Sequence, residues 1–302
     1  ELSNALGGPR RALTTVLNAR LISLLDRLIK STSLQLEQLG LNCALMVVKG
    51  DGTLLQADYA RTRPVETVLS GPAASISGAA FLVGEEDFIV SDIGGTTTDI
   101  ARLRGGVVQT SADGAIVGGW RTNVEAAHIR TFGLGGDSVV SVNSRDLKGG
   151  ICLGPRRAIP LSLLSTQQPQ IKEILRQQTE QAIAQGTDGR FVLAMVKAEA
   201  VPKWLTRSET KLLYQLIEMG VAALADIATT QVALGAVDRL ITRGLAMLSC
   251  FTPTDAAHVL GQFDEFDTYS AELGAQLLAR QKSGSGSQLA ADGLEAAKMV
   301  ID

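Results

Sequence analysis

The chain has few of the residues that build disulfide frameworks and metal centres. Its 302 residues include three cysteines and two histidines, and the cysteines are widely spaced with no Cys-x-x-Cys pair. An odd, scattered set of cysteines argues against a disulfide framework or a cysteine-based zinc site, and it fits a reducing compartment. We therefore expect a cytoplasmic protein.

Excess charge and long apolar runs are also missing. Twenty-eight Lys and Arg against 31 Asp and Glu give a net charge of −3, which gives no support to a nucleic-acid partner. No apolar run reaches the ~18–20 residues of a membrane helix, and the first residues lack a signal-peptide pattern. We therefore expect a protein that binds neither membrane nor nucleic acid. Because 45% of the residues are hydrophobic, we also expect the chain to fold.

Hydrophobic periodicity divides the chain into three expected parts: 1–40, 41–160 and 161–302. In the first part, apolar residues recur at steps of three and four over 11–39, which predicts a long amphipathic helix ended by Gly40. The third part is expected to be mainly helical, with a flexible loop near 282–288.

The middle part alternates short apolar runs with glycine turns. Small apolar residues over 73–82, after the break at Gly71-Pro72, predict a helix that another backbone can approach closely. Strands are expected at 41–48, 88–95, 98–104, 106–111, 137–143 and 151–154, and beyond this part at 190–198. Helices are expected at 169–185, at 268–281 and over most of 206–248.

The strongest chemical signal is the octapeptide Asp-Ile-Gly-Gly-Thr-Thr-Thr-Asp at 92–99. It lies between two expected strands. Gly94 and Gly95 have no Cβ, so backbone N–H groups there can approach an anion closely. The next residues supply three hydroxyls, those of Thr96, Thr97 and Thr98.

The two ends of the octapeptide carry carboxylates. Asp92 and Asp99 can hold Mg²⁺ or orient an attacking water. A plain glycine hairpin with capping threonines is the alternative, but the whole pattern after an apolar strand favours nucleotide binding. The chain has no Walker loop, and Gly133–Ser138 lacks the spacing of a dinucleotide-binding loop.

The octapeptide resembles the second phosphate loop of the actin, sugar kinase and heat-shock chaperone ATPase superfamily. The small-residue helix before it and the glycine loop Gly133–Ser138 after it stand where that superfamily has similar segments. Five segments together resemble, in order, the hydantoinase/oxoprolinase family, hydantoinase A type, over roughly residues 10–265. They are TTVLNARL (14–21), RPVETVLSGPAASISGAA (63–80), VSDIGGTTTDIA (90–101), FGLGGDSVVSV (132–142) and FTPTDAAHVLG (251–261).

This resemblance implies an α/β fold: an actin-like (ribonuclease H-like) ATPase lobe with a mixed sheet over 41–160, plus the mainly helical portion. It also implies Mg-ATP-dependent hydrolysis of a cyclic amide, a hydantoin or 5-oxoproline, whose oxygen is activated by phosphorylation before water attacks. We assign catalytic roles to Asp92 and Asp99, and magnesium binding to Asp92 and Asp137. The expected nucleotide-binding residues are Gly94, Gly95, Thr96, Thr97, Thr98, Gly135 and Gly136.

The sequence also departs from the family pattern. A first phosphate loop and a GGAGP-like segment for the adenosine side are absent. We therefore expect the middle part of a longer protein, which alone binds ATP weakly or not at all. Its expected partners are those missing segments or a hydantoinase B type subunit, and a homo-oligomer is compatible with the sequence.

Other departures concern single residues. The family's Asp-x-His metal pair corresponds to His128 and Arg130, so we expect His128 to be a surface or core-edge residue, not a metal ligand. A DPGPACYG-like stretch is not evident, and LGPRRAIP (153–160) stands nearby, with Arg156 and Arg157 as anion contacts or solvated side chains.

For three further residues, a structural interpretation stands beside a functional one. We expect Cys152 to be a buried packing residue, Asp255 to cap a helix, and Lys49 to be exposed to solvent. Two alternative functions remain for the whole chain. One is the nucleotide-binding subunit of an ATP-dependent ketone carboxylase, and the other is a non-catalytic, nucleotide-gated binding module.

Overall fold

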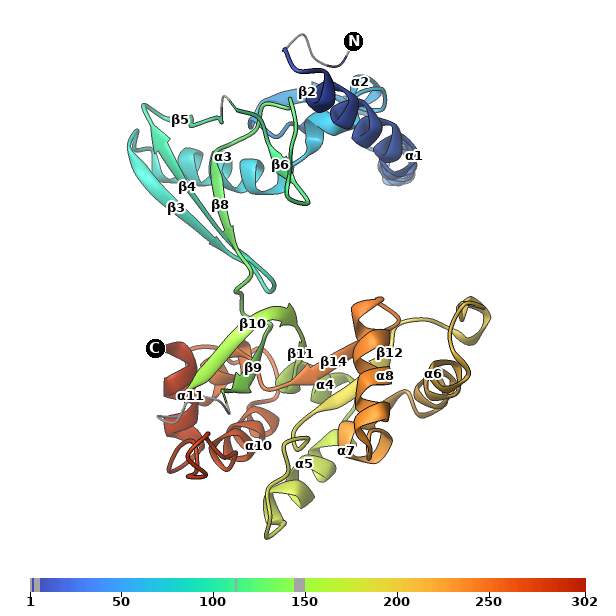
Figure 1. Cartoon of the computed structure of the whole chain (residues 1–302). Helices are drawn as coiled ribbons and strands as arrows, with labels where there is room; N and C mark the ends of the chain where they lie inside the picture. Colours follow the sequence, from blue (N-terminus) through green and yellow to red (C-terminus); the bar gives the residue numbers. More distant parts are fainter. Residues whose placement is uncertain (1, 3–5, 112, 144–149) are drawn as a thin grey trace. The chain divides into compact units, whose positions relative to one another are not determined.

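The computed structural model describes residues 2, 6–111, 113–143 and 150–302. The chain forms two compact units (Figure 1). The first comprises Glu1–Ile93 and Thr98–Phe132, and the second comprises Gly94–Thr97 and Gly133–Asp302. The expected border at residue 160 is therefore not the one observed. Residues 133–160 join the second unit because Val140 and Ala158 are buried in its two cores.

The α/β fold class expected from the sequence is confirmed. The first unit contains helices α1 (Gly8–Gln38), α2 (Ala57–Ala60), η1 (Pro64–Thr67) and α3 (Ser70–Val83). Its strands are β1 (Met46–Val48), β2 (Leu54–Gln56), β3 (Phe88–Ile93), β4 (Thr98–Arg104), β5 (Val107–Val108), β6 (Ile116–Val117), β7 (Trp120–Arg121) and β8 (Ile129–Phe132). Strand β4 is central: it pairs antiparallel with β3 on one side and with β5 and β8 on the other.

Helix α1 confirms the expected long amino-terminal helix and ends before Gly40, whose φ is 70°. A positive φ is a common way to end a helix, and glycine adopts it without strain. The expected strand at 41–48 is shorter in the structure. Its partner β2 ends at Gln56, where α2 begins, so only Met46–Val48 find a paired strand.

Helix α3 covers one face of the β3–β4 sheet. It begins at Ser70, three residues before the expected start, because Pro72 is compatible with the first turn of a helix, where no N–H is needed. Ile76 packs with Leu103 and Ala101, and these residues form the small core of this sheet.

The residues of two family-like segments meet in this unit. Asn18 of α1 is 6% exposed. Its side-chain amide donates to the Thr62 carbonyl at 3.1 Å, and its oxygen accepts the Val65 N–H at 3.1 Å. Asn18 therefore joins α1 to the segment that leads into α3.

We expect Asn18→Ala to lower the free energy of unfolding by about 1–3 kcal/mol, because two backbone groups would lose their partner in a buried place. Denaturant unfolding followed by circular dichroism measures this difference. Asn42→Ala is the matched control, since Asn42 is exposed, and it should change the stability by less than about 0.5 kcal/mol. Equal effects of the two substitutions would contradict the role of Asn18.

The second unit is built around a four-stranded sheet in the order β11-β14-β12-β13. Its strands are β9 (Ser138–Val142), β10 (Ile151–Arg157), β11 (Ile159–Pro160), β12 (Phe191–Ala194), β13 (Val221–Ala223) and β14 (Ala246–Cys250). Its helices are α4 (Leu161–Gln167), α5 (Ile171–Glu180), η2 (Ala198–Ala200), α6 (Arg207–Met219), α7 (Leu224–Ile227), α8 (Gln231–Thr242), α9 (Pro253–Val259), α10 (Thr268–Ala279) and α11 (Gly293–Ile301).

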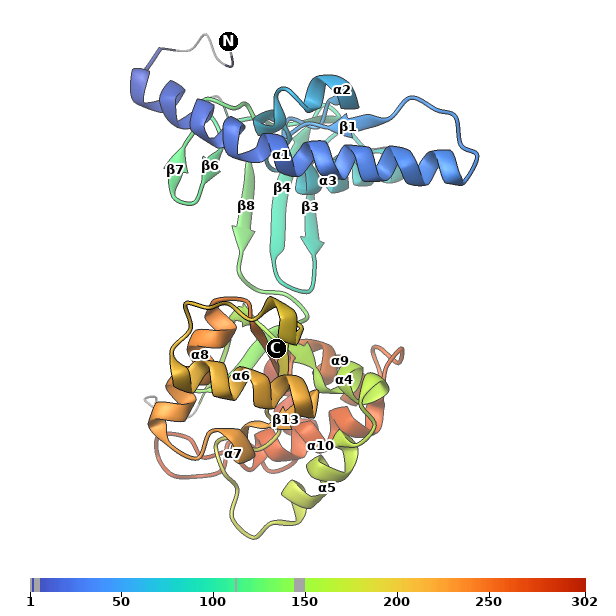
Figure 2. The same cartoon turned by 90° about the vertical axis from the view of Figure 1, so that its right-hand side faces the viewer.

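Helices cover both faces of this sheet. The alternation of side chains along β12 sends Phe191 into a core with α4, α5, α9, α10 and α11, and Val192 into a core with α6, α7 and α8. The latter three helices lie toward the viewer in Figure 2. Because β12 is covered on both faces, its sequence reads as a continuous apolar run.

The expectation of helix over most of 206–248 was wrong for two segments, β13 and β14. Both strands are short and apolar on both faces, and such runs cannot be told from buried helix by periodicity. Glycines with positive φ, Gly220 and Gly244, end the preceding helices. The loop at 282–288 is exposed apart from Ser283, and a bridge between Lys282 and Gln288 closes it. No helix among the described residues is long and apolar enough to cross a membrane.

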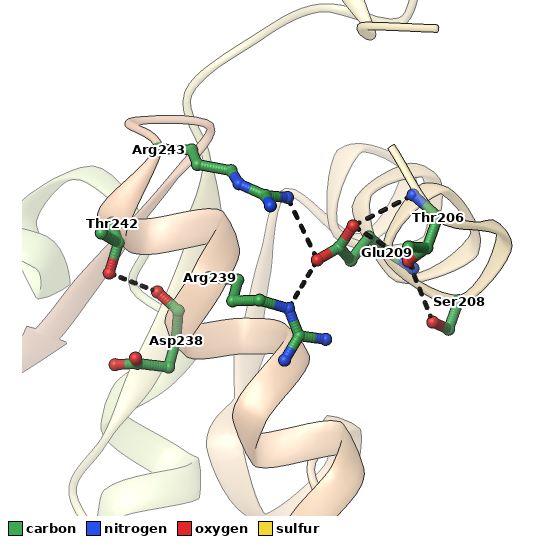
Figure 3. A network of polar contacts seen from close by, with 7 residues as sticks. All are labelled: Thr206, Ser208, Glu209, Asp238, Arg239, Thr242 and Arg243. Atoms are coloured by element: carbon green, nitrogen blue, oxygen red, sulfur yellow. Dashed lines mark hydrogen bonds and ion pairs between the residues drawn. The ribbon is translucent and has the colours of Figure 1, made fainter. Parts of the chain in front are cut away.

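A charged network ties α6 to α8, as Figure 3 shows. The Glu209 carboxylate is 1% exposed and accepts hydrogen bonds from Arg239 at 2.7 Å and Arg243 at 3.1 Å. Its second oxygen accepts the N–H of Thr206, which completes a capping box at the start of α6. The hydrogen bond from Arg239, followed by that from Thr206, lowers the pKa of Glu209 from its usual 4.5 to about 2.

We expect Glu209→Gln to lower the free energy of unfolding at pH 7 by about 1.5–3 kcal/mol, because glutamine keeps the cap but loses the charge. The folded state holds the ionised form, so this stabilisation is complete above pH 4.5 and is lost as the pH falls towards 2. Denaturant unfolding at several pH values tests whether the stabilisation is lost over this pH range. Glu173→Gln is the control: Glu173 also pairs with an arginine, Arg176, but it is solvent-exposed, and the loss should stay below about 1 kcal/mol.

Candidate functional site

The octapeptide forms a tight hairpin between β3 and β4. Ile93 pairs with Thr98, and the Gly94 N–H donates to the Thr97 carbonyl at 2.9 Å. Gly94 is therefore not an available donor, contrary to the expectation from the sequence. Within the described part of the chain, no hydrogen bond engages the backbone N–H groups of the next three residues, Gly95, Thr96 and Thr97. The bend Gly94–Thr97 thus presents three successive donors, a pattern suited to an anion.

The glycine loop Gly133–Ser138 holds this bend from the side of its carbonyl groups. The Gly136 N–H donates to the Gly94 carbonyl at 3.0 Å, and the Asp137 N–H donates to the Gly95 carbonyl at 2.8 Å. A Cβ on Gly135 would lie 2.4 Å from the Gly94 carbonyl oxygen and 2.6 Å from the Gly95 carbonyl carbon. The two backbones approach so closely that position 135 must be glycine.

The start of α9 holds the glycine loop in turn. Thr254 donates both its N–H, at 2.8 Å, and its hydroxyl, at 2.9 Å, to the Gly136 carbonyl. The buried His258 ring contacts the Thr254 carbonyl through Nδ1 at 2.8 Å, and its Nε2 accepts the Phe266 N–H at 3.1 Å. Nothing in the sequence predicts this role of Thr254 beyond its place in a family-like segment.

Asp255 has the capping role expected for it, and it caps two helices. Its carboxylate is fully buried and accepts the Thr252 N–H of its own helix and the N–H groups of Leu161 and Ser162 at the start of α4. Burial raises the pKa of Asp255, although these hydrogen bonds act in the opposite direction. Asp255 thereby fixes the helix from which Thr254 reaches the glycine loop.

Asp137, one of the two expected magnesium ligands, lies against the bend. Its oxygen Oδ2 accepts hydrogen bonds from Arg157 at 3.1 and 2.9 Å. A Cβ on Gly95 would lie 2.5 Å from the same oxygen, so this residue must also be glycine unless the carboxylate moves. Arg157 is half-exposed, whereas the Asp137 side chain is only 16% exposed.

Asp92 and Asp99 lie in the strands of the first unit. They are directly opposite each other in the β3–β4 register, and both are partly exposed. The Thr131 hydroxyl of β8 donates to Asp99. Like charges directly opposite on a sheet destabilise it by about 0.2–1 kcal/mol, so a cation bound between the carboxylates would relieve this pairing.

The remaining candidate residues have ordinary surroundings. His128 and Arg130 are exposed, and no cluster of three or more potential metal ligands occurs among the described residues. Cys152 was expected to be buried but is exposed, because it points away from the core on the hairpin strand β10. Lys49 was expected to be solvent-exposed but is only 26% exposed, and it pairs with Asp51 and Glu66.

The expected anion contacts Arg156 and Arg157 both have carboxylate partners. Arg156 pairs with Asp238 at 2.6 Å, and Arg157 pairs with Asp137. Of these two arginines, only Arg157 belongs to the network around the bend. The site therefore consists of a bend with free donors, a glycine loop, a threonine from α9 and an Asp–Arg pair.

The sequence profile of a family described as hydantoinase/oxoprolinase matches residues 11–238. The chain is 30% identical to the caprolactamase subunit alpha of Pseudomonas jessenii over 49% of its length, and 27% identical to the acetophenone carboxylase gamma subunit of Aromatoleum aromaticum over 51%. The chain spans about a fifth of the length of each relative, 21% in both cases.

A solved structure is also similar. It is the nucleotide-free structure of acetone carboxylase, from work on ATP-dependent acetone carboxylation. The match has a TM-score of 0.38 and 23% sequence identity, and it covers 43% of this chain and 18% of that one.

Proposed function

Since the chain belongs to the hydantoinase/oxoprolinase family, we propose that it binds the phosphates of ATP and takes part in the ATP-dependent opening of a cyclic amide. The name of one relative, a caprolactamase subunit, supports a lactam or hydantoin as the substrate class. We further propose that the chain works in the cytoplasm with a second type of subunit, since two relatives are named as subunits.

One observation carries the proposal: the bend Gly94–Thr97 keeps three successive N–H groups free while the carbonyl groups of Gly94 and Gly95 are bonded to the glycine loop. The Gly136 and Asp137 N–H groups fix the bend from behind, so its donors are oriented before a ligand arrives. Preorganised donors of this kind favour an anion such as a phosphate group. The hydroxyls of Thr96 and Thr97 add donors beside them.

The residues around the bend fit a magnesium ion as well. Mg²⁺ takes one or two protein carboxylates together with phosphate oxygens and water, so a cluster of three ligands is not required. Asp92, with Asp99 opposite it, would hold it from the strands of the first unit, and Asp137 is a separate candidate in the second unit. When bound, the ion would neutralise charge on the phosphates. The unfavourable Asp92–Asp99 pairing supports this assignment because a cation would relieve it.

Asp92 and Asp99 can also orient water by accepting its hydrogen bonds. Thr131 fixes the Asp99 carboxylate through a hydrogen bond, which leaves Asp92 as the freer of the two. We therefore propose that Asp92 has the larger role in the hydrolysis of ATP. Thr254 acts as a positioning residue because it holds Gly136 and touches no expected ligand.

The similarity to an acetophenone carboxylase subunit favours a second candidate function, nucleotide binding in a ketone carboxylase. A screen of phosphate release separates the two. The protein in its natural form, with any co-purifying subunits, is incubated with Mg-ATP and either cyclic amides (hydantoins, 5-oxoproline, caprolactam) or acetophenone with bicarbonate. Stimulation by a cyclic amide supports the proposal, and stimulation only by the ketone with bicarbonate supports the carboxylase. Binding of ATP without stimulation by any of these compounds would support a nucleotide-gated binding module.

A further inference from the structure

One pocket of the second unit has a strongly basic lining. It has a volume of about 370 Å³ and lies between the end of β9, the loop after α5, the start of β12 and the end of α10. Three cations line it: Arg190, Arg280 and Lys282. None of its described lining residues is acidic, and none belongs to the bend or the glycine loop.

Arg190 is the residue whose situation is hardest to explain without a ligand. It is partly buried at the start of β12, and its side chain has no hydrogen bond or ion pair in the part of the chain that the structure describes. Taking a cation out of water without a partner costs free energy. A guanidinium group can offer five donors in a planar fork, a geometry that matches the oxygens of a phosphate or carboxylate.

The other two cations differ in mobility. Arg280 is held in place because its guanidinium donates to three carbonyl groups at the end of α5, those of Gln178, Thr179 and Gln181. These carbonyls satisfy its donors but do not cancel its charge. Lys282 is exposed and its side chain has no partner among the described residues, so the ammonium group can move toward a ligand.

Two glutamines complete the lining. Gln185 and Gln281 line the pocket, and their side-chain amides have no hydrogen-bonding partner among the described residues. The nearest acidic group in this loop is Asp188, which is 4% exposed and already accepts the Gln185 N–H at 2.7 Å. Among the described residues, one buried carboxylate stands against three cations, so the charge of this part of the lining is positive.

We propose that Arg190, Arg280 and Lys282 form a binding site for the oxyanion of a small ligand, a phosphate or carboxylate group, apart from the proposed ATP site. Arg190 binds two oxygens through its fork, Arg280 supplies fixed charge, and Lys282 closes on the ligand from the loop at 282–288. This site goes beyond the proposed function and does not depend on it.

Calorimetric titration of the purified protein tests the site, with inorganic phosphate in one arm and citrate in the other, at constant ionic strength set with sodium chloride. We expect saturable binding in at least one arm, and the arm that binds identifies the class of oxyanion. Arg190→Gln and Lys282→Gln should each weaken binding about tenfold or more, and Arg190→Lys should weaken it less because it keeps the charge.

Two controls make the result decisive. Lys211→Gln removes one exposed charge from α6, outside the pocket, and should leave binding unchanged. Asp92→Ala should also retain binding, because Asp92 lies in the first unit and takes part only in the proposed ATP site. Lys282 lies on an exposed loop, so Lys282→Gln should fold normally. The titration of Lys282→Gln therefore tests the proposal even if Arg190→Gln does not fold. Absence of saturable binding in both arms, equal loss in Lys211→Gln, or loss in Asp92→Ala would overturn the proposal.

Discussion

Gly135→Ala should weaken ATP binding strongly and destabilise the second unit. The added methyl group would lie 2.4–2.7 Å from three backbone atoms of Gly94 and Gly95, and backbone cannot move aside as the end of a side chain can. The bend and the glycine loop must therefore separate. We expect the free energy of unfolding to fall by about 1–3 kcal/mol or more, and ATP affinity to fall at least about tenfold.

Denaturant unfolding and calorimetric titration with Mg-ATP measure the two effects of Gly135→Ala. The matched control is Gly235→Ala in α8, where the nearest atom to a new Cβ is the end of the Arg239 side chain at 3.4 Å. An alanine in that helix should raise the stability by about 0.5–1 kcal/mol and leave ATP binding unchanged. A Gly135→Ala protein as stable as the natural one would show that the two glycine segments are not interlocked.

Asp92→Ala should separate activity from stability. We expect ATP hydrolysis by the natural form of the protein to fall about 100-fold or more, because Asp92 is proposed to hold magnesium and orient water. The stability should stay the same or rise by about 0.2–1 kcal/mol, because the substitution removes a like-charged neighbour of Asp99. If Asp92 had only a structural role, Asp92→Ala would instead lower the free energy of unfolding.

Steady-state phosphate release and denaturant unfolding test this prediction together. Asp113→Ala removes an exposed carboxylate that pairs with Arg121, and it should affect neither measurement strongly. If Asp92→Ala hydrolysed ATP as fast as the natural protein, the assignment of the octapeptide as the phosphate loop would be wrong. Retention of ATP binding with loss of turnover would place Asp92 in the chemical step rather than in binding.

Local patterns predicted some elements well. Steps of three and four predicted α1 because a long helix repeats its apolar face many times, and the run 88–95 predicted β3 because it stands between polar turns. The short strands β13 and β14 were not predicted, because their sequences lack such a pattern. Each is buried on both faces, so neither carries an alternation that separates a strand from a buried helix.

The sequence by itself determined the family, the α/β fold class and the hairpin with two glycines between two aspartates, because these depend on the order of residues along the chain. Only the tertiary structure decided which groups of that hairpin are free. The Gly94 N–H is used within the bend, and the donors of Gly95, Thr96 and Thr97 are not.

The same distinction holds for the supporting residues. Gly135 could be noted in the sequence as one glycine among several, but its need for a hydrogen side chain comes from the backbone of residues 94 and 95, 40 positions away. Thr254 and Arg157 were placed beside the loop by folding alone. Contacts between distant segments depend on how the strands and helices pack, and no local pattern records that packing.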